Sequence, residues 1–455
     1  MHISLRATFG GLGVAALLAA CSAGTGGSSM FSGGGDGGDG HGGNGATTGS
    51  GTGTNTGAGD TGSGISLTTS GSGQSTGSGS TCDHAPDVDG DGDGWTTNEG
   101  DCNDCDPNVN PGAIDVLTTE DGGTTMVDVD CNGTFDPPEP CDTGLAVDSA
   151  NAIDAAKAVD LCRVASQNPA NKKDKTWGVV HAAWVLADGS DPASAGINLT
   201  NYHLGHGMLN GFGPNVHVQG GQSMLGLSSG TARQPTDSGY SSVGGFDKLY
   251  TSGSPAGFPK ESPACPNVTT GTPHDSAAVE LTIRTPTNAT GFTFDFNFFT
   301  YEWPAYVCSQ YNDFFVALLS PIPQGQVDGN ISFDSQGNPV SVNNALVDVC
   351  DCATTGYNTT SCSGVPAGGC CAKGKPFACA LGTSGLQGTG FDGHASTGWL
   401  VTKAPVKGGE TITLRWTVYD SGDGVLDSTT LIDNWKWIAN GGTVVVGTDP
   451  IKTPQ

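Results

Sequence analysis

Positively charged residues are scarce in this chain. Its 455 residues include 17 Lys and Arg against 45 Asp and Glu, which gives a formal net charge of −28. Residues 82–142 hold 17 of these acidic residues and no Lys or Arg. Because phosphate binding needs clustered Lys and Arg, we expect no nucleic-acid partner. Divalent cations are the expected counter-charge, and a solvated acidic linker is the alternative.

The N-terminus lacks an apolar run long enough to cross a bilayer. Gly10 to Ala20 is mostly apolar but too short for a stable spanning helix. It ends in Leu18-Ala19-Ala20-Cys21, which resembles the lipobox of a bacterial lipoprotein. The resemblance implies that residues 1–20 are a signal peptide and that lipid on Cys21 anchors the protein to a membrane. Because Ser22 follows the cysteine, we expect the outer membrane or cell surface. An ordinary secretory signal peptide is the alternative.

Large apolar residues are rare in the segments that follow. Residues 21–81 consist mainly of Gly, Ser and Thr, so they cannot bury a core and should form a disordered, flexible linker. Residues 82–142 are rich in Asp but poor in large apolar residues, so metal or disulfides should be needed to order them. A proline-rich hinge then leads into a C-terminal domain of residues 143–455.

The cysteine cluster at 350–379 lacks the spacing of common zinc sites. The chain has 15 cysteines, and 14 remain when Cys21 is set aside. They divide into an even group between positions 82 and 162 and an even group between 265 and 379. Each group can therefore close its own disulfides in an exported compartment. The cluster at 350–379 contains no C-x-x-C pair, which favours disulfides over zinc there.

No catalytic motif stands out. The sequence contains no P-loop, and His203 and His206 are not part of the H-E-x-x-H pattern of a metalloprotease. Glu302 and Asp313 would be the pair to consider for glycoside hydrolysis, but two carboxylates in a β-rich protein are weak evidence. We therefore expect a protein that is not an enzyme and assign no catalytic residue.

What the chain does have is a ladder of aspartates, in which carboxylates recur at every second position from Asp87 to Asp93. The intervening glycines allow the positive φ angles of a tight loop. Such a loop suits a hard cation with six to eight oxygen ligands, and we predict Ca²⁺ because copper would need His or thiolate. An EF-hand is excluded, since counting from Asp89 places Gly100 at position 12, where a Glu is needed. The predicted ligands are Asp87, Asp89, Asp91, Asp93, Asp101, Asp104, Asp106, Asp128 and Asp130.

The order of these residues resembles a metal-binding motif of exported Gram-negative bacterial proteins. That motif has a D-x-D-G-D-G start, a D-C-x-D-x-D-P centre, a P-G-A turn and a D-x-D-C-[DN]-G close. Asp115 stands where the motif tends to have Glu, Cys105 is extra, and residues 116–127 look like an insertion. The resemblance implies a disulfide between Cys102 and Cys131 that clamps the two halves of the site.

The C-terminal domain has the pattern of a mainly β protein. Residues 148–164 predict one helix, capped by Asp148 or Ser149. Polar and apolar residues alternate over Gly291–Phe299 and Thr411–Tyr419, which predicts half-buried antiparallel strands. Further strands are expected at 279–283 and 444–446. With no second helical stretch, the expected fold is an antiparallel β-sandwich or jelly roll.

Two blocks of this domain resemble the choice-of-anchor L domain, a β-rich module of exported bacterial proteins. The first block runs from Phe292 to Phe315 and contains Tyr301-Glu302-Trp303-Pro304, and the second runs from Tyr419 to Ser428. The resemblance implies the architecture and an exported location, with the lipobox as the anchor. It implies no mechanism, because the activity of the family is not established.

Carboxylates at strand ends and in loops of these blocks suggest a second calcium site that joins them. Turn-capping aspartates are the alternative. The residues of this second set are Glu302, Asp313, Asp420, Asp423 and Asp427.

The expected function is that of a non-enzymatic, calcium-binding surface lipoprotein in adhesion. Its β domain would bind a glycan, a matrix polymer or another surface protein. The expected contact residues are Tyr301, Trp303, Tyr306 and Tyr311, and packing in the core is the alternative for them. The other functions considered are a metal-binding structural coat protein and, third, a carbohydrate-active hydrolase.

Overall fold

The structure is a computed structural model. The residues it describes are 84–120, 123–135, 140–343, 346–351, 370–372, 375–439, 441–452 and 454. The predicted signal peptide, lipidated Cys21 and linker therefore lie outside the described residues, as does Cys82.

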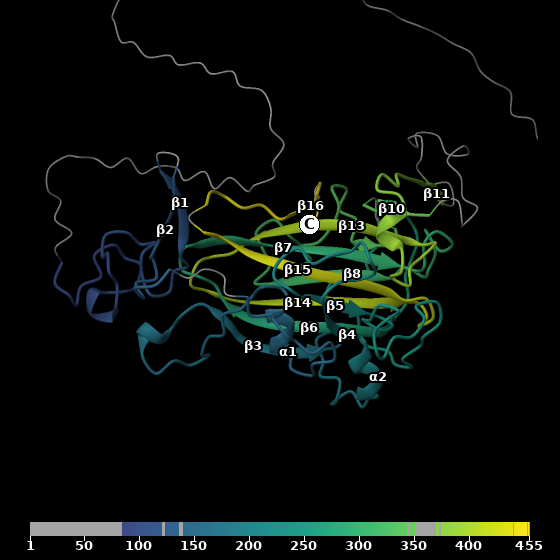
Figure 1. The fold of residues 1–455 in the computed structure, drawn as a ribbon, viewed down its shortest axis with the longest axis horizontal. Coiled ribbons are helices and arrows are strands. Elements are labelled where there is room, and N and C mark those ends of the chain that lie inside the picture. Colours follow the sequence, from purple (N-terminus) through teal and green to yellow (C-terminus); the bar gives the residue numbers. More distant parts are fainter. Residues whose placement is uncertain are drawn as a thin grey trace, which may run out of the picture. The chain divides into compact units, whose positions relative to one another are not determined.

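Two antiparallel sheets form a β-sandwich (Figure 1). One sheet has the order β3-β6-β14-β8-β9, and the other has the order β10-β13-β7-β15-β5-β4 with β16 paired to β13. The predicted mainly β, antiparallel fold is confirmed. The strands of the first sheet are β3 (Gly178–Val185), β6 (Pro273–Arg284), β8 (Phe314–Ser320), β9 (Val340–Ser341) and β14 (Thr411–Ser421). Those of the second are β4 (His206–Leu209), β5 (Met224–Ser228), β7 (Ala289–Thr300), β10 (Val349–Cys350), β13 (Ala395–Pro405), β15 (Ser428–Ala439) and β16 (Gly447–Pro450).

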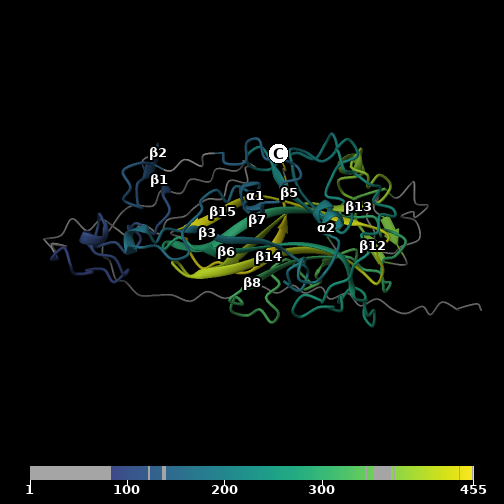
Figure 2. The same cartoon turned by 90° about the horizontal axis from the view of Figure 1, so that it is seen from below.

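The long central strands alternate between the two sheets along the chain. The chain passes from β6 to β7 to β8 and from β13 to β14 to β15, changing sheet at each step. In Figure 2, β14 and β8 lie below β7 and β15. Since Thr411 pairs with Arg284 and Ser421 with Pro273, the β6–β7 turn and the β14–β15 loop lie at opposite ends of the sandwich. These two connections carry the sites described below.

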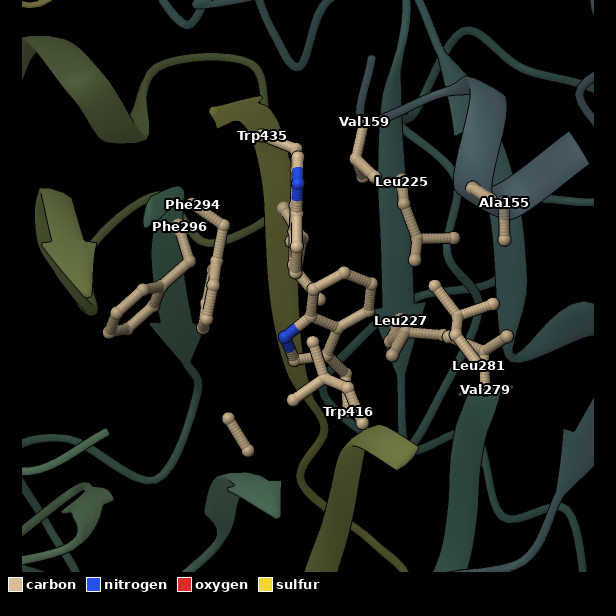
Figure 3. Packing of buried hydrophobic residues seen from close by; sticks show 14 of the residues in the cluster. Ala155, Val159, Leu225, Leu227, Val279, Leu281, Phe294, Phe296, Trp416 and Trp435 are labelled. Atoms are coloured by element: carbon tan, nitrogen blue, oxygen red, sulfur yellow. The ribbon is translucent and has the colours of Figure 1, made fainter. Parts of the chain in front are cut away.

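The core fills the space between the sheets. The predicted inward faces are confirmed: the four alternate phenylalanines of β7 (Phe292, Phe294, Phe296 and Phe298) are fully buried, and the apolar residues of β14 pack against them. Figure 3 shows Phe294, Trp416 and Trp435 together in this layer. Interdigitated aromatic rings therefore hold the two sheets in contact.

The opposite face of β7 differs from the prediction, because it is also buried. Thr293, Asp295 and Asn297 are 6%, 5% and 3% exposed. The segment before β5 folds over this face, where the backbone N–H groups of Gln219 and Gly220 donate to Asp433 on β15. The alternation correctly separated the two faces, but it did not show that a loop covers the polar one.

The predicted helix at 148–164 is much shorter in the structure. Helix α1 spans Ala152–Lys157, and Asn151 caps it by accepting a hydrogen bond from the N–H of Ile153. Asp160 has φ of 68°, which ends any helical path, and Cys162 is bound to Cys141. The expectation of no second helix is also wrong, since α2 spans Leu199–Leu204. Neither helix of the described residues is long and apolar enough to cross a membrane.

The remaining elements are small. The strand predicted at 444–446 is wrong, because β16 begins at Gly447. The segment that looked like an insertion forms the hairpin of β1 (Val116–Glu120) and β2 (Gly123–Val127). A second hairpin joins β11 (Cys370–Ala372) to β12 (Lys375–Phe377). The 3-10 helices among the described residues are Thr97–Glu99, Lys172–Asp174 and Ser384–Leu386.

Disulfides stay within the two groups that the sequence predicted. The bridges between described residues are Cys102–Cys131, Cys141–Cys162, Cys265–Cys308 and Cys350–Cys379. Cys105 and Cys371 are also disulfide-bonded. The first of these bridges is the pair that the resemblance to the metal-binding motif implied.

Candidate metal centres in the Asp-rich module

The first candidate centre is the loop from Asp89 to Gly94. Asp89 accepts hydrogen bonds from the backbone N–H groups of Gly92 (2.7 Å) and Gly94 (2.9 Å). Asp91 accepts from the N–H of Asp93 at 3.1 Å, and Asp93 accepts from that of Trp95 at 2.6 Å. Gly94 has φ of 93°, a conformation that glycine adopts without strain. These bonds turn the Asp89, Asp91 and Asp93 carboxylates toward one point.

The segment from Asp128 to Gly133 repeats this hydrogen-bonding pattern. Asp128 accepts from the N–H of Gly133 at 3.0 Å, as Asp89 does from Gly94 five residues on. Asp130 accepts from the N–H of Asn132 at 3.2 Å, and Asn132 accepts from that of Thr134 at 2.7 Å. Both segments read D-x-D-x-[DN]-G, so the module contains two similar loops.

Each loop gathers enough oxygen for a cation. Oxygens of Asp89, Asp91 and Asp93 lie within 4.8 Å of one another, and so do oxygens of Asp115, Asp128 and Asp130. In each group one buried oxygen accepts no hydrogen bond from the described residues, Oδ2 of Asp91 and Oδ1 of Asp128. An all-oxygen set of this kind suits calcium.

The carboxyl groups in and beside the first group repel one another. Burial, and then the negative charges of Asp91 and Asp101, raise the pKa of Asp93 to about 6. Burial and the nearby Asp91, Asp104 and Asp89 likewise raise the pKa of Asp101. A bound cation would reverse these effects by favouring the charged carboxylates.

The other predicted ligands have different positions. Asp87 is exposed and lies outside both gathered groups. Asp101 is buried, and its Oδ2 accepts no hydrogen bond from the described residues. It lies outside both gathered groups, but near enough to Asp91 and Asp89 for their charges to raise its pKa. Asp104 holds the loop in place by accepting from the N–H of Gly90 at 2.9 Å. Asp106 accepts from both nitrogens of Asn108, which is the role of a turn-forming residue.

Two residues of the second centre, Asp115 and Asn132, were absent from the predicted set. Asp115 accepts from the N–H of Val129 at 2.8 Å and belongs to the second group. Its position after the P-G-A turn could have identified it, because the metal-binding motif that the sequence resembles has an acidic residue there. Asn132 occupies the fifth position of the second loop, and the repeated D-x-D-x-[DN]-G spacing would have identified it. The Cys102–Cys131 disulfide places the second loop beside the chain that follows the first.

Asn110 connects the first loop to the β-sandwich. This fully buried side chain donates to Oδ2 of Asp93 at 2.8 Å and accepts from the hydroxyl of Thr287 at 2.7 Å. Beside it, Asn288 exchanges two hydrogen bonds with the backbone of Ile114, at 2.9 and 3.0 Å. Thr287 and Asn288 lie in the β6–β7 turn, so these hydrogen bonds link the first loop directly to the sandwich.

Two ion pairs add to this contact. Arg163 lies 3.4 Å from Oδ2 of Asp130, and Lys172 lies 2.6 Å from Glu99. The Lys172 ammonium also lies 5.5 Å from the ring centre of Trp95. Because Lys172 and Glu99 are well exposed, their pair contributes little by itself. Of the two pairs, only the one between Arg163 and Asp130 involves a loop of a candidate centre, and it joins the second loop to the C-terminal domain.

The second predicted set lies mainly at the other end of the sandwich. Asp313 precedes β8, Asp420 lies near the end of β14, and Asp427 immediately precedes β15. These three residues are at most 1% exposed. Glu302 follows β7 and is 2% exposed, and Asp423 is half-buried in the β14–β15 loop. The buried Glu302 and Asp313 would not be open to a polysaccharide in this conformation.

The predicted aromatic contact surface is only partly available. Trp303 is fully buried, so the prediction is wrong for this residue and core packing describes it. Tyr301 stacks on His394 with ring centres 3.4 Å apart. Tyr306 is 36% exposed and meets the half-buried Tyr311 nearly at right angles, with ring centres 5.6 Å apart.

Comparison with known proteins gave no match to a family model, a curated protein or a solved structure. The chemistry of the two loops therefore carries the functional argument.

Proposed function

We propose that residues 82–142 form a calcium-dependent structural module of an exported surface lipoprotein. The observation that carries this proposal is the pair of D-x-D-x-[DN]-G loops, each gathering three carboxylates within 4.8 Å. Calcium at the first loop would fix Asp93 and hence Asn110, which bonds to the β6–β7 turn. The module would thereby become a stiff connection between a lipid-anchored linker and the β-sandwich.

Weak binding would be sufficient for this role. Extracellular calcium modules have dissociation constants on the order of 10⁻⁴–10⁻³ M. The proposed location is the outer membrane or cell surface, with lipid on Cys21, in the manner of a choice-of-anchor L protein. The disulfides support export, because such bonds persist in oxidising compartments.

The test is limited proteolysis of the full chain in millimolar calcium and in EDTA. We expect calcium to slow cleavage within residues 84–135 at least about tenfold, since ligand binding stabilises the folded form by mass action. Asp91→Asn combined with Asp128→Asn should abolish this protection. Fragment masses would show which module the metal orders.

Asp87→Asn is the matched control, because it removes a charge from the same ladder outside both gathered groups. It should keep the full calcium effect. If Asp87→Asn loses protection as completely as the double variant, the acids attract calcium non-specifically and the two sites are not supported. If calcium leaves wild-type cleavage unchanged, the proposal fails.

We further propose that the β-sandwich is a binding domain for a glycan, matrix polymer or surface protein. Tyr306 and Tyr311 support this, since aromatic side chains supply much of the energy of such contacts. On an array of surface polysaccharides, Tyr306→Ala with Tyr311→Ala should weaken the strongest binding at least about tenfold. Phe135→Ala, at an exposed aromatic of the Asp-rich module, should not. Equal binding by both variants, or no binding by the wild type, would contradict this role.

A further inference from the structure

Three buried carboxylates lie together at the end of the sandwich that carries the β14–β15 loop. Phe314 of β8 pairs with Tyr419 of β14, so Asp313 and Asp420, the next residues along, lie at adjacent positions of the five-stranded sheet. Asp427 immediately precedes β15, which belongs to the seven-stranded sheet. Carboxylates from both sheets are thus brought to one end of the sandwich, with exposures of 1%, 1% and 0%.

The hydrogen bonding of these carboxylates is incomplete. Asp313 accepts from the hydroxyl of Ser428 at 2.6 Å and from the N–H of Ser421 at 3.3 Å. Both oxygens of Asp427 are buried and accept no hydrogen bond from the residues that the structure describes. Asp420 likewise has no hydrogen bond of normal geometry there, although the Asp313 carboxyl and the Ser229 hydroxyl adjoin it. Uncompensated buried carboxylates of this kind are costly.

Among the described residues, the neighbouring groups do not supply the missing hydrogen-bond partners. The buried Lys248 donates its ammonium hydrogen to the carbonyl of Ser228 at 3.0 Å rather than to a carboxylate. Asp275 lies at the same end, but its oxygens accept the N–H groups of Lys248 and Tyr250 and hold that turn. The positive charge of Lys248 is therefore too small to balance the neighbouring carboxylates. Burial raises the pKa values of Asp313, Asp420 and Asp427. The charge of Asp313 further raises those of Asp420 and Asp427, and the charge of Asp423 further raises that of Asp313.

The backbone is shaped around Asp427. A Cβ atom on Gly230 would lie 2.1 Å from Oδ2 of Asp427, so only glycine lets the chain pass so close to this carboxylate. The N–H of Asp427 donates to the carbonyl of Val243, and its carbonyl accepts from the N–H of Tyr301. The carboxylate is therefore held inside the structure by fixed backbone rather than left there by a flexible loop.

We propose that Asp313, Asp420 and Asp427 bind a divalent cation that ties the two sheets together. The ligands would be carboxylate oxygens, so the cation class is a hard one, with calcium as the probe. Among the described residues, these three do not gather as closely as the two groups of the Asp-rich module. Bound water would complete the shell, as calcium sites commonly allow. Of the five residues in the second set predicted from the sequence, the proposed ligands are these three. Glu302 and the half-buried Asp423 are not included.

Calcium binding by the full chain provides the test, in a background that disables the surface loops (Asp91→Asn with Asp128→Asn). We expect this background to retain one bound calcium by equilibrium dialysis and to gain thermal stability with calcium. Adding Asp427→Asn should remove both effects. If the background binds no calcium, or if Asp427→Asn leaves the bound calcium unchanged, the proposal is overturned.

The sign of a stability change separates a cation site from a proton-sharing cluster. In EDTA, Asp427→Asn should raise the melting temperature because it removes an acid whose charged form the folded site disfavours. In calcium the same substitution should lower the melting temperature, because it removes a ligand. A cluster that never binds metal would give the same sign in both buffers, which would refute the proposal. Asp449→Asn, at an exposed acid, should change neither. Should Asp427→Asn not fold, calcium titration of the folded background still decides the question.

Discussion

Replacing Trp416 with alanine should lower the free energy of unfolding by about 3–5 kcal/mol, the usual cost of truncating a buried tryptophan. Trp416 is fully buried on β14 of the five-stranded sheet. Its ring meets Phe294 of β7 edge-on with centres 5.3 Å apart and Trp435 of β15 at 6.2 Å. One side chain thus contacts two strands of the opposite sheet, as Figure 3 shows. Truncating it would open a cavity that rigid strands cannot close.

Urea unfolding in calcium buffer, followed by circular dichroism, would measure this loss. Trp416→Phe is the informative control, because the Trp416 indole N–H has no hydrogen-bond partner among the described residues. Phenylalanine keeps an aromatic ring and removes that unsatisfied donor, so the expected cost is below about 1.5 kcal/mol. Val445→Ala, at a residue 67% exposed, should stay within about 0.5 kcal/mol. A loss below about 1 kcal/mol for Trp416→Ala would show that the two sheets do not depend on this contact.

The sheet architecture could be predicted because its signal is local. Alternation along Gly291–Phe299 and Thr411–Tyr419 records which side chains face the core, and the structure buries those faces. The covering of the other β7 face is a long-range event. It depends on Gln219 and Gly220, which are distant in the chain from Asp433 and Asp295. No periodicity within a strand contains that information.

Helix α1 shows the same limit. The composition of residues 148–164 favours a helix, and its middle part does form one. The end is set instead by tertiary constraints: Asp160 takes a left-handed conformation, and the disulfide to Cys141 holds Cys162. Val159 then accepts a hydrogen bond from the N–H of Trp435, so the chain becomes part of the sandwich instead of continuing the helix.

The candidate metal site divides in a similar way. The D-x-D-x-[DN]-G loops are made of neighbours in sequence, so spacing alone located Asp89, Asp91 and Asp93. Asp115 joins Asp128 and Asp130 only because the β1–β2 hairpin returns the chain to it. Likewise, nothing local to Asn110 indicates that it will bond to Thr287, which is 177 positions away. Long-range partners of this kind become visible only in the folded chain.

Asp433 should make stability fall as the pH rises from about 4 to about 8. Burial, above all, raises the pKa of its carboxyl from 3.8 to about 8, despite hydrogen bonds from the N–H groups of Gln219, Gly220 and Asn434. The folded protein therefore holds a proton that the unfolded chain releases near pH 4. A group with a raised folded pKa stabilises fully below its unfolded pKa, and this contribution is lost as the pH rises through the folded value.

Comparing Asp433→Asn with the wild type isolates this effect. The asparagine cannot titrate, so its free energy of unfolding relative to the wild type should rise by up to about 1.4 kcal/mol per pH unit between pH 4 and 8. The total would be on the order of 5 kcal/mol. Urea unfolding at a series of pH values, at constant calcium, would measure it. Asp295→Asn should behave alike only up to about pH 6, the raised pKa of Asp295, because burial shifts that carboxyl less. If Asp433→Asn and the wild type gave parallel curves, Asp433 would be charged in the folded protein, and its three N–H partners would outweigh burial.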